Sequence, residues 1–589
     1  MEPPIERKNV EEKPCLVPAE RGFSVSYKGR FLYSKYEPDR AIIGAIHAAR
    51  FLPSTLILAA SPVLWLGLPS LLEKLPENSF VLGIEWDKNL HELARTELDK
   101  LRSADGLPSP EKEKLSCVAL LPFEENDYIV NVLTKDRMPQ KSSAARVLPH
   151  ISTFRRALML EMSGGARLNK EKYMGSAALA ENAVASFWKN RITLTKLGRL
   201  YSRNLFRNLG LLPRRIDFRN LRKKVRRPIF VFGAGESLEK TLSSIPKNLL
   251  ERCLILSVDA GTAALRAHGI KTDVICAVEG QLATERAYIG GCGKDSLIIA
   301  DISSRPQVTR HTKKAVAYFA SRYTDSAFLT SLYEKDFFPP EIPPLGSVGL
   351  SAVHIATLLR ENTDIPIFVS GLDFSFSPGK THAKNTSVHI TRLSSSNRLN
   401  PPENYDAAFR AGAMRVLGKN GIPIFTDTVL ESYKKNFSDF FRNTPNLYDC
   451  GAQGLPLGIT ELSNESLRAF LEGLPATESA LTENHGTLWN GEDCPAGEKA
   501  LRIREYLEQE EKALNRIKEL LMFGNDVASC SQSIEEELYY LISRREYLFL
   551  HFPDGYRCGA ENLSFLKRAR GQIDFFLKDI KLSLQELNT

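Results

Sequence analysis

The central part of the chain alternates short apolar runs with stretches of helical spacing. Runs of this kind, rich in Val, Ile, Leu and Phe, suit strands that are buried on both faces of a sheet. Their alternation with helices predicts an α/β fold with a doubly wound, mainly parallel, Rossmann-like sheet over residues 228–460. The expected strands are PIFVF (228–232), CLILSVD (253–259), DVICAVE (273–279), SLIIADI (296–302), AVAYFA (315–320), PIFVSGLD (366–373) and PIFTDT (423–428).

A smaller version of this pattern precedes the central part. The runs STLILAA (54–60) and SFVLGIEWD (79–87) flank a helical stretch, so a smaller α/β domain is expected over residues 1–188. Glu85 follows the second run, where nucleotide-binding folds can place a carboxylate against a ribose. The first turn, AASPVLWLG, lacks the glycine spacing of such a site. A scaffold without a ligand is therefore the favoured interpretation of this domain.

Residues 51–72 carry no charge and are long enough to span a membrane. They contain three prolines and the strand-like TLILAA, so a buried strand and helix are expected instead. The charged N-terminus has no apolar segment typical of a secretory signal. Nine scattered cysteines without a C-x-x-C pair indicate reduced thiols, and hence a cytoplasmic protein without disulfides or a zinc site.

Residues 189–227 carry fourteen Lys or Arg against a single acid, Asp217. The segment begins with helical apolar spacing, so a basic helix followed by a linker is expected. A charge run usually forms a solvated face, and the competing interpretations are an acidic partner protein, a membrane surface or nucleic acid. No nucleic-acid signature accompanies the run, and a net charge of +8 is modest for 589 residues. Helical spacing returns afterwards and predicts a C-terminal helical domain over 461–589, for packing or partner binding.

The stretch FVFGAGESL (230–238) joins an expected strand to an expected helix through a Gly-Ala-Gly-Glu-Ser turn. Backbone N–H groups and the helix dipole would point at one spot there, which suits an anion. Ser237 is a candidate N-cap of this helix, and Ser347 is a candidate N-cap after a second glycine turn. In open α/β sheets ligands bind beyond the carboxyl ends of the strands. The polar and glycine residues expected at this edge are Gly233, Ala234, Gly235, Ser237, Asp259, Glu279, Gln281, Asp301, Ser303, Gly346, Ser347, Asp373, Lys380, Thr381 and His382.

Several well-known kinds of active site do not fit these residues. The turn is not G-x-x-x-x-G-K-[ST], and Leu238 stands where a dinucleotide fingerprint has its third glycine. The chain has no H-E-x-x-H and no G-x-S-x-G motif. The central domain also lacks an Asp-x-Asp pair, so no metal site is expected there. What remains is a turn able to hold a phosphodiester without a metal.

Five stretches of the central part resemble the motility accessory factor (Maf) family of flagellin glycosyltransferases. They are FVFGAGESLEKTL, SVDAGTAALRAHGIKTDVICAVEG, GSVGLSAVHIATLL, PIFVSGLDFSFSPGKTHA and LYDCGAQGLPLGI. The resemblance covers residues 225–460, and GRFLYSKYEPDRAI (29–42) is similar to the N-terminal domain of that family. The turn also resembles the Gly-x-Gly-x-Ser-Leu loop with which bacterial sialyltransferases contact CMP. Glu236 stands where those loops usually have Pro.

The resemblance implies transfer of a nonulosonic acid, such as pseudaminic or legionaminic acid, from a CMP-linked donor to Ser or Thr of flagellin. No tightly bound cofactor is expected. In an inverting displacement the N–H groups of residues 233–237 would stabilise the CMP leaving group. His382 is the first choice of general base, with Asp373 and Glu279 in reserve. Lys380 or Arg305 would pair with the carboxylate of the donor. The other residues expected to bind the donor are Gly233, Ala234, Gly235, Ser237, Asp259, Gln281, Ser303, Gly346, Ser347 and Thr381.

Two other function classes stay open. Related domains include archaeal 6-hydroxymethylpterin diphosphokinases, but their chemistry needs carboxylates around Mg²⁺, and the run VEGQ offers only one acid. A non-catalytic, flagellin-binding assembly factor is the second alternative, because Glu236 replaces the usual Pro. The sequence is compatible with a homo-oligomer and does not decide the oligomeric state.

Overall fold

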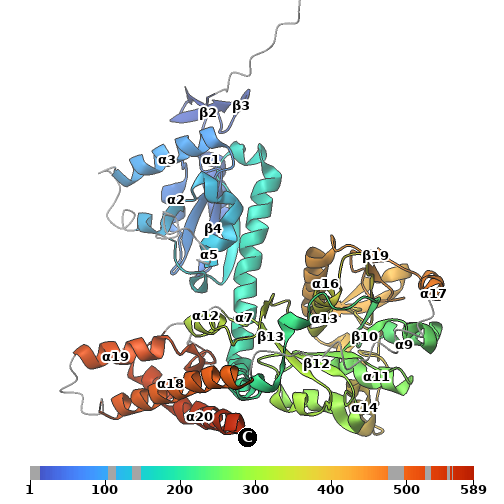
Figure 1. Ribbon diagram of the computed structural model, residues 1–589. Coiled ribbons are helices and arrows are strands. Elements are labelled where there is room, and N and C mark those ends of the chain that lie inside the picture. The colour runs from blue at the N-terminus through green and yellow to red at the C-terminus, as the bar shows by residue number, and fades with distance from the viewer. Residues whose placement is uncertain are drawn as a thin grey trace, which may run out of the picture. The chain divides into compact units, whose positions relative to one another are not determined.

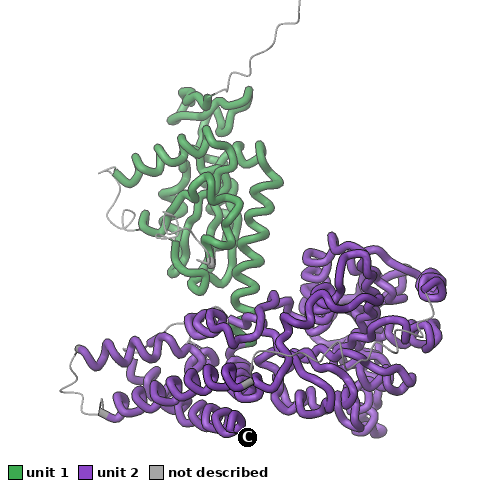
Figure 2. The backbone as a smooth tube through the Cα atoms, in the orientation of Figure 1, with its two compact units in different colours: residues 1–193 green, residues 194–589 purple. Residues whose placement is uncertain are grey.

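The computed structural model describes residues 13–103, 114–134, 148–324, 326–474, 496–523, 532–553, 558–559 and 562–588. The chain divides into two compact units, residues 1–193 and 194–589 (Figure 2). The division falls within helix α7 (Lys170–Leu211), so each unit contains a part of this helix. The finer division into four parts stays a prediction.

Unit 1 contains a four-stranded parallel sheet with the strand order β6-β5-β4-β7. Every residue of its central strand β4 is buried, because helices cover both faces of the sheet. The uncharged stretch 51–72 forms β4 and most of α2, whose three leucines are buried, so the predicted strand and helix are confirmed. No described helix is long and apolar enough to cross a membrane. The elements of this unit are β1 (Cys15–Pro18), β2 (Phe23–Tyr27), β3 (Arg30–Phe31), α1 (Arg40–Ala48), β4 (Thr55–Ala60), α2 (Leu68–Glu73), β5 (Phe80–Ile84), α3 (Lys88–Ser103), β6 (Val118–Leu120), α5 (Ile129–Thr134) and β7 (Arg156–Glu161).

Unit 2 is built on a mainly parallel sheet with the order β14-β13-β12-β11-β10-β9-β15-β18-β19, and β8 pairs with β13. Helices lie on its faces (Figure 1), which confirms the predicted doubly wound α/β fold. The strands are β8 (Ile216–Asp217), β9 (Ile229–Phe232), β10 (Leu254–Val258), β11 (Val274–Ala277), β12 (Leu297–Asp301), β13 (Val316–Ser321), β14 (Glu341–Ile342), β15 (Ile367–Ser370), β18 (Leu447–Asp449) and β19 (Thr460–Glu461). The strand order reverses at β9, since β10 follows on one side and β15 on the other. A ligand crevice is therefore expected beyond the ends of β9 and β15.

The helices of unit 2 alternate with these strands, and after β19 the described α-helices follow one another. They are α8 (Phe218–Leu221), α9 (Ser237–Ser244), α10 (Lys247–Leu250), α11 (Thr262–Ala267), α12 (Ala327–Tyr333), α13 (Val348–Leu359), α14 (Ser387–Ser394), α15 (Asp406–Phe409), α16 (Thr428–Phe441), α17 (Asn464–Gly473), α18 (Ala496–Phe523), α19 (Gln532–Ser543) and α20 (Leu563–Asn588). The predicted C-terminal helical region is thus confirmed by α17 to α20.

One predicted strand lies outside the main sheet. PIFTDT forms β17 (Pro423–Asp427), which pairs antiparallel with β16 (Ala413–Leu417) in a separate hairpin. The predicted place of this strand in the parallel sheet was therefore wrong. Its residues alternate between buried and more exposed positions, as in a strand with one face toward the core and one toward solvent. The position next to β15 belongs to β18, whose short run LYD did not stand out as a strand. Residues 371–446, here called the insertion, connect β15 to β18 and include the hairpin.

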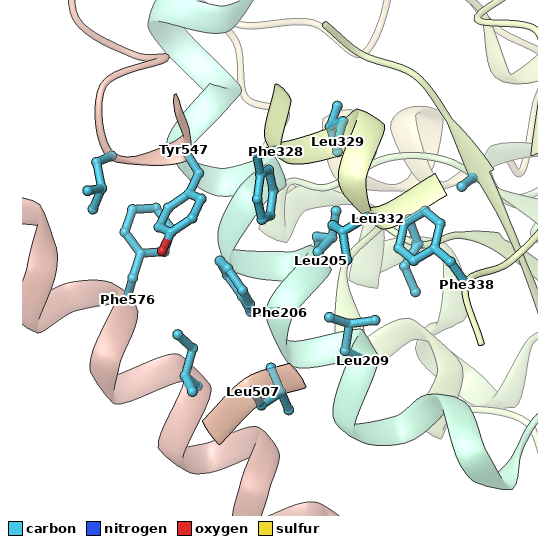
Figure 3. Close-up of a cluster of buried hydrophobic side chains, with 14 of the residues drawn as sticks. Leu205, Phe206, Leu209, Phe328, Leu329, Leu332, Phe338, Leu507, Tyr547 and Phe576 are labelled. Atoms are coloured by element: carbon cyan, nitrogen blue, oxygen red, sulfur yellow. The ribbon is translucent and has the colours of Figure 1, made fainter. Parts of the chain in front are cut away.

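The C-terminal helices pack against α7 and α12 through an aromatic cluster (Figure 3). The ring of Phe206 on α7 lies 5.0 Å from that of Tyr547 and 6.0 Å from that of Phe576, measured between centroids. Phe328 on α12 completes the group, 5.7 Å from Phe206. The C-terminal region is therefore part of the core of unit 2.

The basic segment 189–227 begins as a helix, as predicted, but its remainder is folded and is not a linker. Helix α7 continues to Leu211, and the rest of the segment forms β8, α8 and short turns. Several of its arginines bind within the chain: the Arg199 guanidinium lies 3.8 Å from the centre of the Phe575 ring, and Arg227 lies 3.3 Å from Asp273. Part of the positive charge thus serves packing of the fold.

The aromatic cluster predicts a large effect of Phe206→Ala on stability. Removing a fully buried ring leaves a cavity, so we expect the free energy of unfolding of unit 2 to fall by about 3–5 kcal/mol. Phe409→Ala is the matched control, because this ring is 82% exposed and its loss should change stability by less than about 0.5 kcal/mol. Denaturant titration measures both, and an equal effect of the two variants would contradict the described core.

Candidate functional site

The glycine turn, residues 233–236, lies directly against the turn that follows β15. The backbone N–H of Gly233 donates to the Ser370 carbonyl at 2.8 Å, and that of Gly235 donates to the Gly371 carbonyl at 2.8 Å. A Cβ atom on Gly233 would lie 2.1 Å from the Gly371 oxygen, so no larger residue fits. Gly371 itself has a φ of +76°, a conformation that favours glycine. Glycines at these positions therefore let the two strand ends meet.

Asp373 holds the start of helix α9. Its carboxylate accepts a hydrogen bond from the Ser237 N–H at 2.8 Å and a second, short one from the Ser237 hydroxyl. The Ser237 oxygen in turn accepts from the Gly371 N–H at 2.9 Å. Ser237 is the first residue of α9 and is fully buried, so it is not the N-cap that the sequence predicted. The Asp373 side chain supplies the capping acceptor from another loop instead.

Burial and the neighbouring groups together determine the pKa of the Asp373 carboxyl group. Burial raises the pKa of this carboxyl group to about 6, and the neighbouring Glu236 carboxylate adds to the rise. The two Ser237 hydrogen bonds and the positive charge of Lys419 oppose it. Asp373 is consequently a carboxylate at neutral pH, already occupied by Ser237.

The turn leaves two backbone donors for a ligand. The N–H groups of Gly233, Gly235 and Ser237 are bonded within the fold, whereas among the described residues those of Ala234 and Glu236 have no partner. These two N–H groups lie beside the start of α9, at the point where the strand order reverses and where open α/β sheets bind ligands. An anion is the ligand that such donors suit.

Residues 380–383 lie next to the turn, as the sequence predicted. The Ala383 N–H donates to the Ala234 carbonyl at 2.9 Å, and the Lys380 ammonium lies 3.5 Å from the Glu236 carboxylate. The acidic residue in place of Pro is thus neutralised by a lysine of the insertion. His382 Nδ1 lies 3.2 Å from the Thr381 hydroxyl, and burial lowers the pKa of His382 below its ordinary 6.5.

Asp259, Asp301 and Ser303 hold the loops of neighbouring strands. Asp259 accepts hydrogen bonds from the Thr284 hydroxyl at 2.6 Å and from the Ala260 N–H at 2.7 Å. The Asp301 carboxylate accepts from the N–H and hydroxyl of Ser303, at 2.7 and 2.5 Å. Burial raises the pKa of both carboxyl groups. These side chains already have partners within the fold, and the donor contacts expected of Asp259 and Ser303 stay a prediction.

Glu279, Gln281, Arg305 and the second glycine turn lie farther along the same edge. Glu279 accepts from the N–H of the exposed Gln281 at 3.1 Å, while the Arg305 guanidinium is paired with Glu285 at 2.6 Å. A role of Arg305 toward a donor carboxylate would compete with that pair. Ser347 is the N-cap of α13, as predicted: its hydroxyl accepts from the Gly349 N–H at 3.3 Å, just after Gly346 with a φ of +81°.

Four residues near the strand ends were missed from the sequence. Asn204 and Asn208, one turn apart on α7, donate from their side-chain amides to the carbonyls of Gly280, Ser303, Ile302 and Ser304. Their spacing of four residues in RNLFRN predicts that both lie on one face of a helix. The neighbouring arginines led to an interpretation of this segment by its charge alone. Lys419 and Asp449 form a buried ion pair beside the Asp373–Ser237 contact. It was missed because β18 was not recognised.

The carboxylate after β5 in unit 1 is enclosed by the protein. Glu85 is fully buried and accepts from the hydroxyls of Ser61 and Tyr173, both at 2.6 Å, and from the Asp87 N–H at 3.1 Å. Burial raises its pKa to about 7. These contacts fit a structural carboxyl group better than a ribose-binding one. No described group of three His, Cys, Asp or Glu residues could hold a metal ion.

Comparisons with known proteins concern this site and the whole chain. A family model described as 6-hydroxymethylpterin diphosphokinase MptE-like matches residues 203–379, which include both turns of the site. An uncharacterized protein of Treponema pallidum (strain Nichols) is 29% identical over 585 residues, covering 96% of this chain and 94% of that protein. The structure of a MAf glycosyltransferase from Magnetospirillum magneticum AMB-1 aligns with a TM-score of 0.47 and 16% identity, covering 98% of this chain and 90% of that chain.

The raised pKa of Asp373 predicts a pH dependence of stability. Because the folded-state pKa of about 6 exceeds the ordinary 3.8, the folded chain binds this proton more tightly than the unfolded chain. The stability that Asp373 contributes is therefore complete below about pH 4 and is lost as the pH rises through about 6. Relative to Asp373→Asn, we expect the wild-type free energy of unfolding to fall by about 3 kcal/mol over this range.

Denaturant titrations of the wild type and of Asp373→Asn between acid and neutral pH measure the difference between their free energies of unfolding. The contributions of other buried carboxyl groups are the same in both proteins and cancel in this difference. A difference that does not change with pH would contradict the described burial of Asp373.

Proposed function

We propose that the protein is a glycosyltransferase that moves a nonulosonic acid from a CMP-activated donor to Ser or Thr of flagellin. The observation that carries the proposal is the pair of N–H groups, on Ala234 and Glu236, for which the described residues offer no partner, at the point where the strand order reverses. The motifs that resemble the Maf and sialyltransferase families give the donor and the acceptor. The alignment with a MAf glycosyltransferase is too distant to add to this support.

In the proposed reaction the phosphate of CMP accepts hydrogen bonds from the N–H groups of Ala234 and Glu236. The bond between the anomeric carbon and the phosphate oxygen breaks, and the negative charge that develops on CMP is stabilised by these donors. The Lys380 ammonium, 3.5 Å from the Glu236 carboxylate, offsets the negative charge that this residue places beside the phosphate. A metal ion is not required in this arrangement.

His382 is the proposed general base. With the proton on Nδ1, donated toward Thr381, the lone pair of Nε2 can accept the proton of the acceptor hydroxyl. Burial lowers the pKa of His382, so the ring is neutral and able to accept a proton at neutral pH. The acceptor oxygen then forms the new bond to the anomeric carbon as CMP leaves. Asp373 is a weaker candidate for the base, because Ser237 occupies its carboxylate.

The test is the intact mass of flagellin co-expressed with the protein in a host that makes the CMP-linked sugar acid. We expect mass increments of one sugar acid per modified site, and a loss of about 10²–10⁴-fold in the rate of transfer with His382→Ala. His268→Ala is the matched control, because this histidine is exposed at the end of α11 and should leave transfer unchanged.

Two outcomes would contradict the proposal. Full transfer by a folded His382→Ala protein would exclude His382 as the base. Unmodified flagellin that co-purifies with the wild-type protein would favour the non-catalytic assembly factor instead.

A pterin diphosphokinase is the second candidate, and the family match over residues 203–379 favours it. This chemistry needs carboxylates that hold Mg²⁺ against ATP. Asp259 and Asp301 lie at the correct edge of the sheet, but hydroxyl and backbone donors already occupy their oxygens. Turnover of ATP and a hydroxymethylpterin with Mg²⁺ would establish this candidate over the glycosyltransferase.

A further inference from the structure

The hairpin of β16 and β17 is anchored by one buried lysine. Leu417 and Ile422, on either side of the hairpin tip, are 69% and 49% exposed, whereas the Lys419 side chain between them is only 6% exposed. Its ammonium lies 2.5 Å from the Asp449 carboxylate and donates to the Gly451 carbonyl at 2.8 Å. The Asp449 side chain is 2% exposed, so the ion pair is enclosed by protein.

This pair adjoins the contact that holds helix α9. A Cβ atom on Gly451 would lie 3.1 Å from the Ser237 hydroxyl oxygen and 3.5 Å from the Lys419 ammonium. The Gly451 backbone is therefore packed between the ion pair and Ser237. The Asp449 carboxylate also accepts from the Gly451 N–H at 3.0 Å, which fixes the backbone at this point.

A second connection runs through the backbone of Lys419. Its N–H donates to the Gly454 carbonyl at 2.9 Å, and the next N–H, of Leu455, donates to the Asp373 carbonyl at 2.9 Å. Gly454 has a φ of +103°, and a Cβ there would lie 2.8 Å from the Asp373 Cα. Lys419 is thus joined to both partners of the Asp373–Ser237 contact, to Ser237 through Gly451 and to Asp373 through Gly454.

The energetics of a buried ion pair favour a role in positioning. Removing two charges from water offsets most of their attraction, so such a pair adds little net stability. It does fix geometry, because an ammonium without its carboxylate is strongly disfavoured in a buried site. The position of the hairpin in which Lys419 meets Asp449 is therefore favoured over any that leaves one of these charges buried and unpaired.

We propose that Lys419 is a positioning residue, which through Asp449, Gly451 and Gly454 holds the Asp373–Ser237 contact and the hairpin in register. The orientation of the Ala234 and Glu236 N–H groups depends on this contact, since both residues lie in the turn that leads into α9. The consequence for donor binding depends on the proposed glycosyltransferase function. The positioning itself does not depend on that function and has a readout of its own.

The test compares Lys419→Met, Lys419→Arg and the double variant Lys419→Met with Asp449→Asn in the full-length protein. The double variant removes both charges and so leaves no unpaired buried carboxylate. Lys435→Met on α16 is the matched control, because this lysine is exposed. The first readout is hydrogen exchange of the Ser237 N–H and of the hairpin amides without ligand. The second readout is the Kd of CMP. The third readout is steady-state kinetics, which gives kcat and KM for the donor separately.

We expect exchange at Ser237 and in the hairpin to accelerate on the order of tenfold or more in Lys419→Met and in the double variant. Lys419→Arg should restore part of the protection, and Lys435→Met should match the wild type. The Kd of CMP should rise on the order of tenfold in the double variant, and KM for the donor should rise with it. A loss of kcat with KM unchanged would contradict a role in positioning the donor site.

The proposal is overturned if the double variant shows wild-type exchange at Ser237, since Lys419 would then only neutralise Asp449. If the wild-type protein binds no CMP, the proposed function fails, and the exchange at Ser237 still decides whether Lys419 positions the contact.

Discussion

The contact between Asp373 and Ser237 joins the two halves of the central sheet at the point where its strand order reverses. Asp373 follows β15 and Ser237 begins α9 after β9, so two hydrogen bonds tie strand ends that are far apart in sequence. In open α/β sheets the connections that follow two such strands run to opposite sides of the sheet, and ligands bind between them. Here the Asp373–Ser237 contact and the backbone hydrogen bonds between the two turns close the gap between the strand ends, and among the described residues the N–H groups of Ala234 and Glu236 have no partner. The position of every proposed ligand contact depends on this closure.

The features around the contact follow from its close packing. Gly233, Gly235 and Gly371 are required because a Cβ atom would collide with the opposite turn. Burial raises the pKa of Asp373, and the positive charge of Lys419 limits the rise. The insertion supplies Lys380 and His382 as well as Asp373, so the segment that holds the start of α9 also carries the proposed chemistry. Structure and proposed mechanism therefore share the same few loops.

Sequence patterns predicted the fold better than the roles of the site residues. The parallel strands were recognisable because they are continuous apolar runs, and the glycine turn because its spacing is specific. Ser237 was expected to bind the ligand, yet it is buried against Asp373, a partner that is 136 residues away and cannot be inferred from local spacing. The role of Lys419 was not predicted either, because its partner Asp449 ends a strand of only three residues that the apolar pattern does not reveal. PIFTDT was misplaced because an apolar run does not reveal which sheet it joins.

The most direct test of the central claim is a crystal structure of the protein with CMP. The account predicts the phosphate within hydrogen-bond distance of the Ala234 and Glu236 nitrogens, with the Lys380 ammonium nearby and the Asp373–Ser237 contact intact. A phosphate bound elsewhere on the chain, or a Ser237 hydroxyl that leaves Asp373 to bind CMP, would contradict it.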